Sequence, residues 1–149
     1  MSTEAGKFVM ESYIENNDYA INIMKMFLLK HGYKIKEKLY EDYDIDILAE
    51  KNNKEFLFEV EIKTGYSFTT RESFRFNTVS FLARKEKWKN TQFYYVIICK
   101  ETDYALVANS DKIFKNEYKE NININTYYRN GKDSFYRVPK EMCKFFKIK

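Results

Sequence analysis

Two short acidic segments separated by a turn are the part of the chain best suited to chemistry. Asp44 and Asp46 alternate with isoleucines, and Glu59, Glu61 and Lys63 alternate with apolar residues further along. Side chains alternate between the two faces of a strand, so the charged residues of each segment share one face. Like charges gathered on one face repel each other unless a cation neutralises them. If the two segments pair as a hairpin, the clustering predicts a divalent metal site beside one lysine.

An ordinary hairpin with its polar face in solvent would show the same alternation. Cross-strand pairs of an acid and a lysine stabilise many sheets. Four acids against one lysine leave the face strongly negative, however, and this imbalance favours a functional site over a plain surface.

The bulk composition predicts one packed domain over residues 1–149. The chain is 44% hydrophobic and 18% aromatic, which is typical of a globular core. No apolar run approaches the length of a membrane span, so we expect no membrane partner. The two cysteines, Cys99 and Cys143, fit neither a zinc motif nor a disulfide framework and favour a reducing, cytoplasmic setting. The sequence also lacks a Ser-His-Asp pattern and a phosphate-binding glycine loop.

Charge is distributed unevenly along the chain. Residues 1–75 carry 11 Lys or Arg and 14 Asp or Glu, a net charge of −3, whereas residues 76–149 carry 15 and 8, a net charge of +7. An acidic first half suits a metal site, and a basic second half suits a phosphate-binding surface. Solvated surface charge would give the same totals, so charge alone does not decide between the two.

The acids would be positioned by a helix followed by three strands. Apolar residues at helical spacing predict a helix over 9–31, and Gly32 is suited to cap its C-terminus. Alternating residues predict three strands, with Asn52-Asn53 as the turn between the last two. These strands are expected at 33–40, 43–50 and 55–63.

The rest of the chain is predicted to continue the sheet and add an appendage. Residues 66–80 are polar and indicate a loop or flap, and further elements follow: a helix at 83–90, strands at 92–100 and 104–108, and a helix at 111–119. Asn130-Gly131 is a strong hairpin signal. Pro139 suits the first turn of a C-terminal helix whose apolar face would be Met142, Phe145 and Phe146.

This order, with an acid on the second strand and Glu-x-Lys on the third, resembles the PD-(D/E)XK nuclease superfamily over about residues 9–108. Asp46 matches the family's strand-two acid, and Glu61 and Lys63 match its (D/E)-x-K pair. Gly32-Tyr33 and the segment 44–49 are similar to the resolvase-like and restriction-enzyme-like branches. The chain departs from the pattern in two places. Ile45 replaces the proline before Asp46, and Glu59 adds an acid.

The resemblance implies an α+β, restriction-endonuclease-like αβββαβ core, with a central mixed sheet flanked by helices. Residues 109–149 would add the hairpin and C-terminal helix. It also implies a Mg²⁺-dependent DNA endonuclease in which Mn²⁺ can substitute. Asp46, Glu61 and the backbone carbonyl of Ile62 would hold the metal, and Lys63 would orient the attacking water or stabilise charge on the phosphate. A helix-one acid would join them: Glu11, Glu15 or Asp18, with Glu15 and Asp18 favoured.

Basic residues outside this cluster are candidates for binding DNA, although a solvated charged helix explains several of them equally well. The candidates are Arg71 and Arg75 in the flap and Arg84, Lys85, Lys87 and Lys89 in the second helix. The basic C-terminal segment is either a DNA-contacting arm or a solubilising tail. Small enzymes of this type usually cut two strands as homodimers, so we expect a homodimer. A junction-resolving enzyme, a restriction- or repair-type nuclease and an inactive nucleic-acid-binding module remain open alternatives.

Overall fold

A computed structural model describes the backbone of residues 2–37, 45–63, 67–83, 91–125 and 130–149. Side chains are described for residues 16–37, 45–63, 67–83, 91–120 and 134–149. The predicted helix over 83–90 falls almost wholly outside these ranges.

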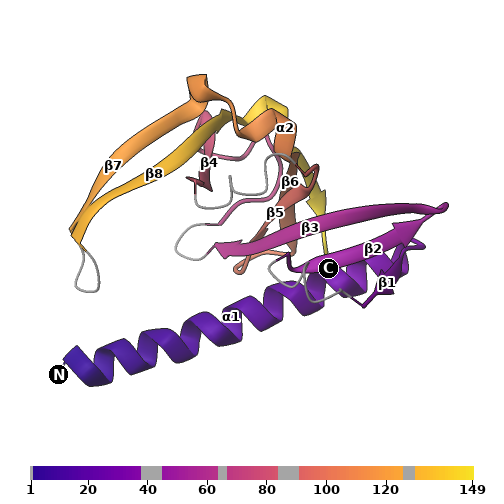
Figure 1. The fold of residues 1–149 in the computed structure, drawn as a ribbon, viewed down its shortest axis with the longest axis horizontal. Coiled ribbons are helices and arrows are strands. Elements are labelled where there is room, and N and C mark those ends of the chain that lie inside the picture. Colours follow the sequence, from indigo (N-terminus) through magenta and orange to yellow (C-terminus); the bar gives the residue numbers. More distant parts are fainter. Residues whose placement is uncertain (1, 38–44, 64–66, 84–90, 126–129) are drawn as a thin grey trace.

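A six-stranded mixed sheet forms the centre of the molecule, with the strand order β1-β2-β3-β5-β6-β9 (Figure 1). Its strands are β1 (Lys34–Lys36), β2 (Ile47–Lys51), β3 (Lys54–Lys63), β5 (Tyr94–Cys99), β6 (Tyr104–Asn109) and β9 (Lys144–Lys147). β3 and β5 are parallel, and the other neighbouring strands are antiparallel. The predicted α+β class with a central mixed sheet is therefore confirmed.

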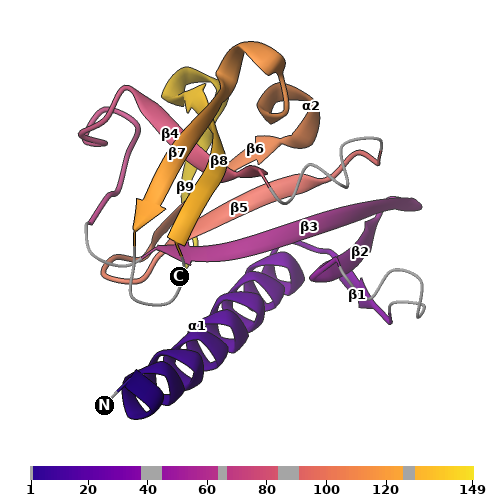
Figure 2. The ribbon, with the colours of Figure 1, turned by 60° about the vertical axis from the view of Figure 1, so that its left-hand side comes forward.

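The long helix α1 (Ser2–Lys30) crosses one face of this sheet (Figures 1 and 2). It ends where predicted, because Gly32 adopts a φ of +87°, which glycine tolerates best. The amide of Tyr33 then donates to the carbonyl of Leu28 at 2.9 Å, which closes the helix end. No helix among the described residues is long and apolar enough to cross a membrane.

The hairpin between β2 and β3 has the turn that the sequence predicts. Asn52 and Asn53 both have positive φ angles, 54° and 64°, and asparagine adopts this region more readily than most residues. The turn fixes the register, in which Ile47 pairs with Phe58. The apolar side chains of β2 and β3 therefore point to the same face of the sheet.

The opposite face of the central sheet is covered by a second sheet of three strands (Figure 2). These strands are, in spatial order, β4 (Thr78–Leu82), β8 (Asn130–Pro139) and β7 (Lys119–Asn125). The short helix α2 (Ser110–Ile113) and the 3-10 turn η3 (Asn116–Tyr118) lead from β6 into β7. The sequence analysis does not predict β4 and therefore does not predict this sheet.

Two hydrophobic clusters lie on the two faces of the central sheet. One packs Ala20, Met24 and Leu28 of α1 against Phe58 and Val60 of β3 and their neighbours. The other lies between the two sheets and includes Phe81, Tyr95, Ile97, Tyr136 and Val138. β3 and β5 contribute alternate residues to each cluster, as the period of a strand requires.

The predicted C-terminal helix is wrong. After Pro139, the 3-10 turn η4 (Lys140–Met142) leads into β9, which pairs with β6. Phe145 packs on the cluster between the sheets and Phe146 on the cluster beneath α1. A strand sends consecutive side chains to opposite faces, whereas a helix would have placed both rings on one side.

Three further predictions need correction. The predicted hairpin is present as β7 and β8, but Asn130 and Gly131 are not its turn, because they pair with Asn125 and Ile124 at the end of the ladder. The predicted helix over 111–119 is limited to α2 and η3, and Lys119 already begins β7. The polar segment 66–80 ends in β4, since Val79 and Phe81 alternate with polar neighbours and are buried. Ladder pairing and burial override the local preferences in all three cases.

The packing of β4 gives a test of the second sheet. Phe81 is fully buried between the sheets, so Phe81→Ala should lower the free energy of unfolding by about 3–5 kcal/mol. Phe76, which is 44% exposed, is the matched control, and Phe76→Ala should cost less than about 1 kcal/mol. Urea denaturation measures both, and equal costs would contradict the burial of β4.

Candidate functional site

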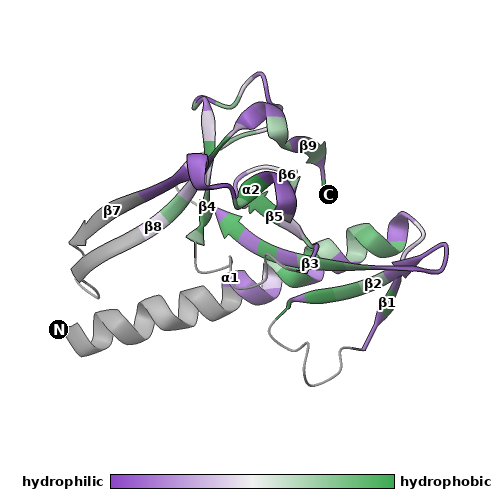
Figure 3. Cartoon of the chain, turned by 45° about the horizontal axis from the view of Figure 1, so that its top comes forward, coloured by the Kyte–Doolittle hydropathy of each residue, from purple (hydrophilic) through white to green (hydrophobic). Residues whose placement is uncertain are grey.

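Polar and apolar residues alternate along β3 towards its C-terminal end, as the bands of colour in Figure 3 show. In register with β5, Glu59 lies beside Tyr95, Glu61 beside Ile97 and Lys63 beside Cys99. These three partners belong to the cluster between the two sheets. Glu59, Glu61 and Lys63 therefore project into the layer that the second sheet covers, and not towards α1.

Asp46 meets β3 at the end of the β2–β3 ladder. The last ladder pair is Ile47 with Phe58, and Asp46 precedes it by one residue. The Oδ2 atom of Asp46 accepts a hydrogen bond from the amide of Val60 at 2.8 Å. A carboxylate thus takes the place that a backbone carbonyl would have in a continued ladder. This bond places the Asp46 carboxylate at the backbone of Val60, the residue that precedes Glu61.

Glu61 uses its two carboxylate oxygens differently. Oε1 lies 3.6 Å from the ammonium of Lys63, and Oε2 accepts a hydrogen bond from the hydroxyl of Tyr95 at 2.5 Å. The side chains of Glu61 and Lys63 are 20% and 25% exposed, so the pair stands where the buried layer meets solvent.

Tyr95 is a site residue that the sequence analysis missed. Its ring is fully buried, and its hydroxyl also accepts the amide of Leu82 at 3.4 Å. Burial raises the pKa of Tyr95 well above 10, and the negative charge of Glu61 and the bond to it act in the same direction. The signal was available, because a tyrosine within an apolar strand needs a hydrogen-bond partner once buried.

Glu59 is buried more deeply than the rest of the cluster. Among the residues with described side chains, it is the one charged residue that is buried, and it lies beside Tyr95 in the β3–β5 register. Its charge adds to the potential that raises the pKa of Tyr95. Because Glu59 is 0% exposed, it forms an inner layer of the site, with Glu61 and Lys63 as the outer layer.

The backbone carbonyl of Ile62 points to the edge of β3 at which Asp46 accepts the amide of Val60. The carbonyl of Lys63 accepts the amide of Lys100, on the β5 side. Successive residues of a strand direct their backbone groups to alternate sides, so the carbonyl of Ile62 points towards the β2 side. There the β2 ladder has already ended, and Asp46 bonds the amide of Val60.

These groups fit a small, hard cation. Mg²⁺ is commonly held by one or two carboxylates and keeps several waters. Asp46, Glu61 and the Ile62 carbonyl supply two carboxylates and one neutral oxygen. No group of three or more His, Cys, Asp or Glu side chains in the described part of the chain is arranged to hold a metal. A site with many protein ligands, such as structural zinc requires, therefore has no support among these residues.

The predicted helix-one acids are not placed at the cluster by the described side chains. Asp18 is exposed, and the helix rotation sets it about 160° from Ala20, which faces the sheet. The side chains of Glu11 and Glu15, and the whole of Asp44, lie outside the described residues. Among the α1 side chains that the structure describes, that of Asn16 reaches this end of the sheet, since its Oδ1 accepts a hydrogen bond from Lys100 Nζ at 2.6 Å.

The predicted DNA-binding residues that the structure describes lie on the surface. Arg71 is paired with Glu72 at 3.8 Å, and Arg75 stacks over the ring of Phe76 at 4.7 Å. Arg84, Lys85, Lys87 and Lys89 lie outside the described residues.

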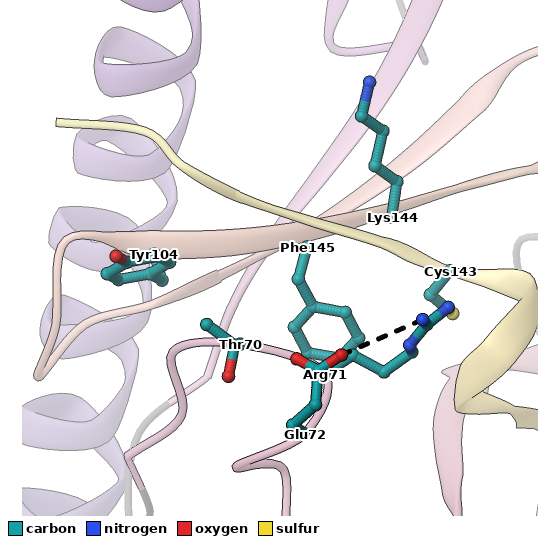
Figure 4. A pocket seen from close by; sticks show the side chains of 7 residues that line it. All are labelled: Thr70, Arg71, Glu72, Tyr104, Cys143, Lys144 and Phe145. Carbon is teal, nitrogen blue, oxygen red and sulfur yellow. Dashed lines mark ion pairs between the residues drawn. The ribbon is translucent and has the colours of Figure 1, made fainter.

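A cavity of about 390 Å³ lies beside Arg71, between the segment 67–77 and β9 (Figure 4). Its lining combines charged, hydroxyl and aromatic side chains, namely Thr70, Arg71, Glu72, Tyr104, Cys143, Lys144 and Phe145. Figure 4 shows Arg71 and Glu72 joined to each other, and Lys144 turned away from Phe145. None of the acids of the cluster lines this cavity, so it is separate from the candidate site.

Comparisons with known proteins give no match: no protein-family model, no curated protein and no solved structure is significantly similar to the chain. The chemistry of the site is therefore argued from its own residues.

The Asp46 bond predicts different costs for two substitutions. Asp46→Ala leaves the amide of buried Val60 without its acceptor and should lower the free energy of unfolding by about 1–3 kcal/mol. Asp46→Asn keeps an oxygen acceptor and should cost less than about 1 kcal/mol. Thermal or urea unfolding measures both, and an equal loss in the two variants would contradict a structural role for this bond.

The raised pKa of Tyr95 predicts a loss of stability at high pH. An unfolded tyrosine ionises near pH 10, whereas folded Tyr95 keeps its proton, so unfolding is favoured as pH rises above about 10. The contribution of Tyr95 should fall by up to about 1.4 kcal/mol per pH unit. The free-energy gap between wild type and Tyr95→Phe should therefore narrow from pH 9 to pH 11. A gap that stays constant over this range would refute the shift.

Proposed function

We propose that the protein is a Mg²⁺-dependent endonuclease that hydrolyses phosphodiester bonds in DNA, with Asp46, Glu61 and Lys63 as its catalytic residues. The observation that carries the proposal is the meeting of Asp46 with β3 beside the Glu61–Lys63 pair. Two acids and a lysine at the partly exposed end of adjacent strands form the arrangement that the resemblance to PD-(D/E)XK nucleases leads us to expect. The α+β fold with a mixed sheet agrees with it.

The roles of the residues follow from their chemistry. Asp46, Glu61 and the Ile62 carbonyl would hold the metal, which lowers the pKa of a bound water and polarises the phosphate. Lys63 carries a positive charge that would stabilise the negative charge developing on the phosphoryl oxygens. The 3.6 Å ion pair with Glu61 keeps this ammonium at the site. Mn²⁺ should replace Mg²⁺, because both accept oxygen ligands in the same geometry.

The surroundings of β3 support a long, charged substrate. Beyond its C-terminal end, the N-terminal half of α1 and the β7–β8 ribbon both project from the body of the molecule (Figures 1 and 2). β8 and the residues after it carry the basic C-terminal segment, including Arg137, Lys140 and Lys144. We propose that this segment and the flap arginines contact the DNA backbone, where salt would weaken binding. A homodimer would present two such sites for cutting two strands.

Cleavage of a panel of labelled DNAs tests the function. The panel holds a four-way junction, a flap, a linear duplex and a single strand, each with Mg²⁺, Mn²⁺ or EDTA. We expect cutting that requires metal and falls by at least about 100-fold in Asp46→Asn and Lys63→Ala, since each removes a group that acts in the transition state. Preference for the junction would indicate a resolving enzyme, and preference for duplex a restriction- or repair-type nuclease.

Lys54→Ala is the matched control for the loss of a lysine. Lys54 lies on the same strand at the far end from Glu61, where it is exposed, so its removal should leave cleavage unchanged. Unchanged cutting in Lys63→Ala and Asp46→Asn would refute the proposed site. Metal-independent DNA binding without any cutting would instead identify an inactive binding module.

A further inference from the structure

Tyr95 links the Glu61 carboxylate to the second sheet. Its hydroxyl lies between Glu61 of β3 and the amide of Leu82 in β4. β4 belongs to the second sheet, so this one hydroxyl joins both sheets at the candidate site. None of the roles proposed above uses it.

The direction of the two hydrogen bonds is fixed by the number of protons available. The amide of Leu82 can only donate, so the Tyr95 oxygen accepts that bond. The single hydroxyl proton is then given to Oε2 of Glu61. Oε1 is consequently the oxygen that is turned towards Lys63.

The tyrosine ring is held as firmly as its hydroxyl. The Phe81 ring meets it edge to face, with centroids 4.8 Å apart, and both side chains are fully buried. Phe81 is itself paired across the second sheet with Tyr136 of β8. A ring enclosed in this way cannot move its hydroxyl away from Glu61 without disturbing the core.

We propose that Tyr95 is a positioning residue that fixes the Glu61 carboxylate through Oε2, so that Oε1 faces the cation beside Lys63. The inference rests on the proposed metal site. Partners that orient a metal ligand in this way commonly contribute 10–100-fold to metal affinity. Through Leu82 and Phe81, Tyr95 also makes the geometry of Glu61 depend on the second sheet.

Direct Mn²⁺ binding to the full chain without DNA tests the inference, with free Mn²⁺ counted by electron paramagnetic resonance. Tyr95→Phe removes only the hydroxyl and should weaken Mn²⁺ binding by about 10–100-fold. Tyr94→Phe is the matched control: it removes the same atom from the neighbouring residue, whose ring packs on the α1 side of the sheet. That variant should bind within about twofold of wild type.

The outcomes separate this inference from the proposed function, because Glu61→Gln is measured alongside. If Glu61→Gln loses Mn²⁺ binding and Tyr95→Phe does not, Glu61 is a ligand and the role of Tyr95 is wrong. If wild type fails to bind Mn²⁺, or Glu61→Gln binds as wild type does, both proposals are wrong. Equal weakening in Tyr94→Phe and Tyr95→Phe would also overturn the inference, since it would indicate general loosening.

A measurement on the wild-type chain covers the case in which Tyr95→Phe does not fold. A buried hydroxyl bonded to a carboxylate exchanges slowly with water, so its proton can be followed by nuclear magnetic resonance. Titration with Mg²⁺ should shift the Tyr95 hydroxyl resonance, because charge on Glu61 is shared with the cation. A resonance that does not respond to Mg²⁺, in a chain that binds it, would contradict the inference.

Discussion

β3 separates two different environments, and the rest of the structure is arranged around that division. Its even-numbered residues from Phe56 to Ile62 pack with the cluster beneath α1, while Glu59, Glu61 and Lys63 point to the other face. The parallel pairing with β5 places β3 near the middle of the sheet, where both faces are covered. A central strand with charged residues on one covered face is expensive to bury, so those residues need partners.

The second sheet covers this face of β3 but leaves part of the candidate site exposed. Over Glu59 the cover is complete, whereas Glu61 and Lys63 remain partly exposed at the end of the strand. Tyr95 brings a hydroxyl into a layer made mainly of aromatic rings and aliphatic side chains. β2 begins at Ile47, so Asp46 lies just outside the strand, and its carboxylate accepts a hydrogen bond from the amide of Val60. Exposure of the charged side chains therefore increases from Glu59 towards the end of β3.

The elements nearest the candidate site were predictable because local chemistry determines them. Gly32 and the pair Asn52-Asn53 have backbone conformations that few other residues adopt. The sequence therefore predicts the end of α1 and the turn between β2 and β3. The period of two along β3 assigned each side chain to its face. The resulting register brings Asp46 to the backbone of Val60, next to Glu61 in the sequence. Tyr95 was not found, because the partners of its hydroxyl, Glu61 and Leu82, lie on other strands that only the tertiary structure brings to it.

The errors lie where distant parts of the chain determine the structure. Phe145 and Phe146 are adjacent in a segment that a helix could also accommodate, and the choice is made by the open edge of β6. Periodicity along the sequence cannot detect this contact, in which Leu106 pairs with Phe145, 39 residues further along the chain. The β7–β8 hairpin is a different case: it was predicted, and only its turn was misplaced, because Asn130 and Gly131 form the last two pairs of the ladder.

The cost of the acid cluster supports a functional reading of it. Asp46, Glu59 and Glu61 all lie on or against one face of a short stretch of sheet, with Lys63 as the cation recorded beside them. A sequence selected for stability alone would place apolar residues at position 59 and at position 95, which the two sheets cover completely. Local rules of core composition are broken at this one place on β3 and followed along the rest of the strand. Such a departure is expected where a protein gives up stability to hold charges for chemistry. The cluster also carries its own positioning group in Tyr95, which a set of charges retained without use would not require.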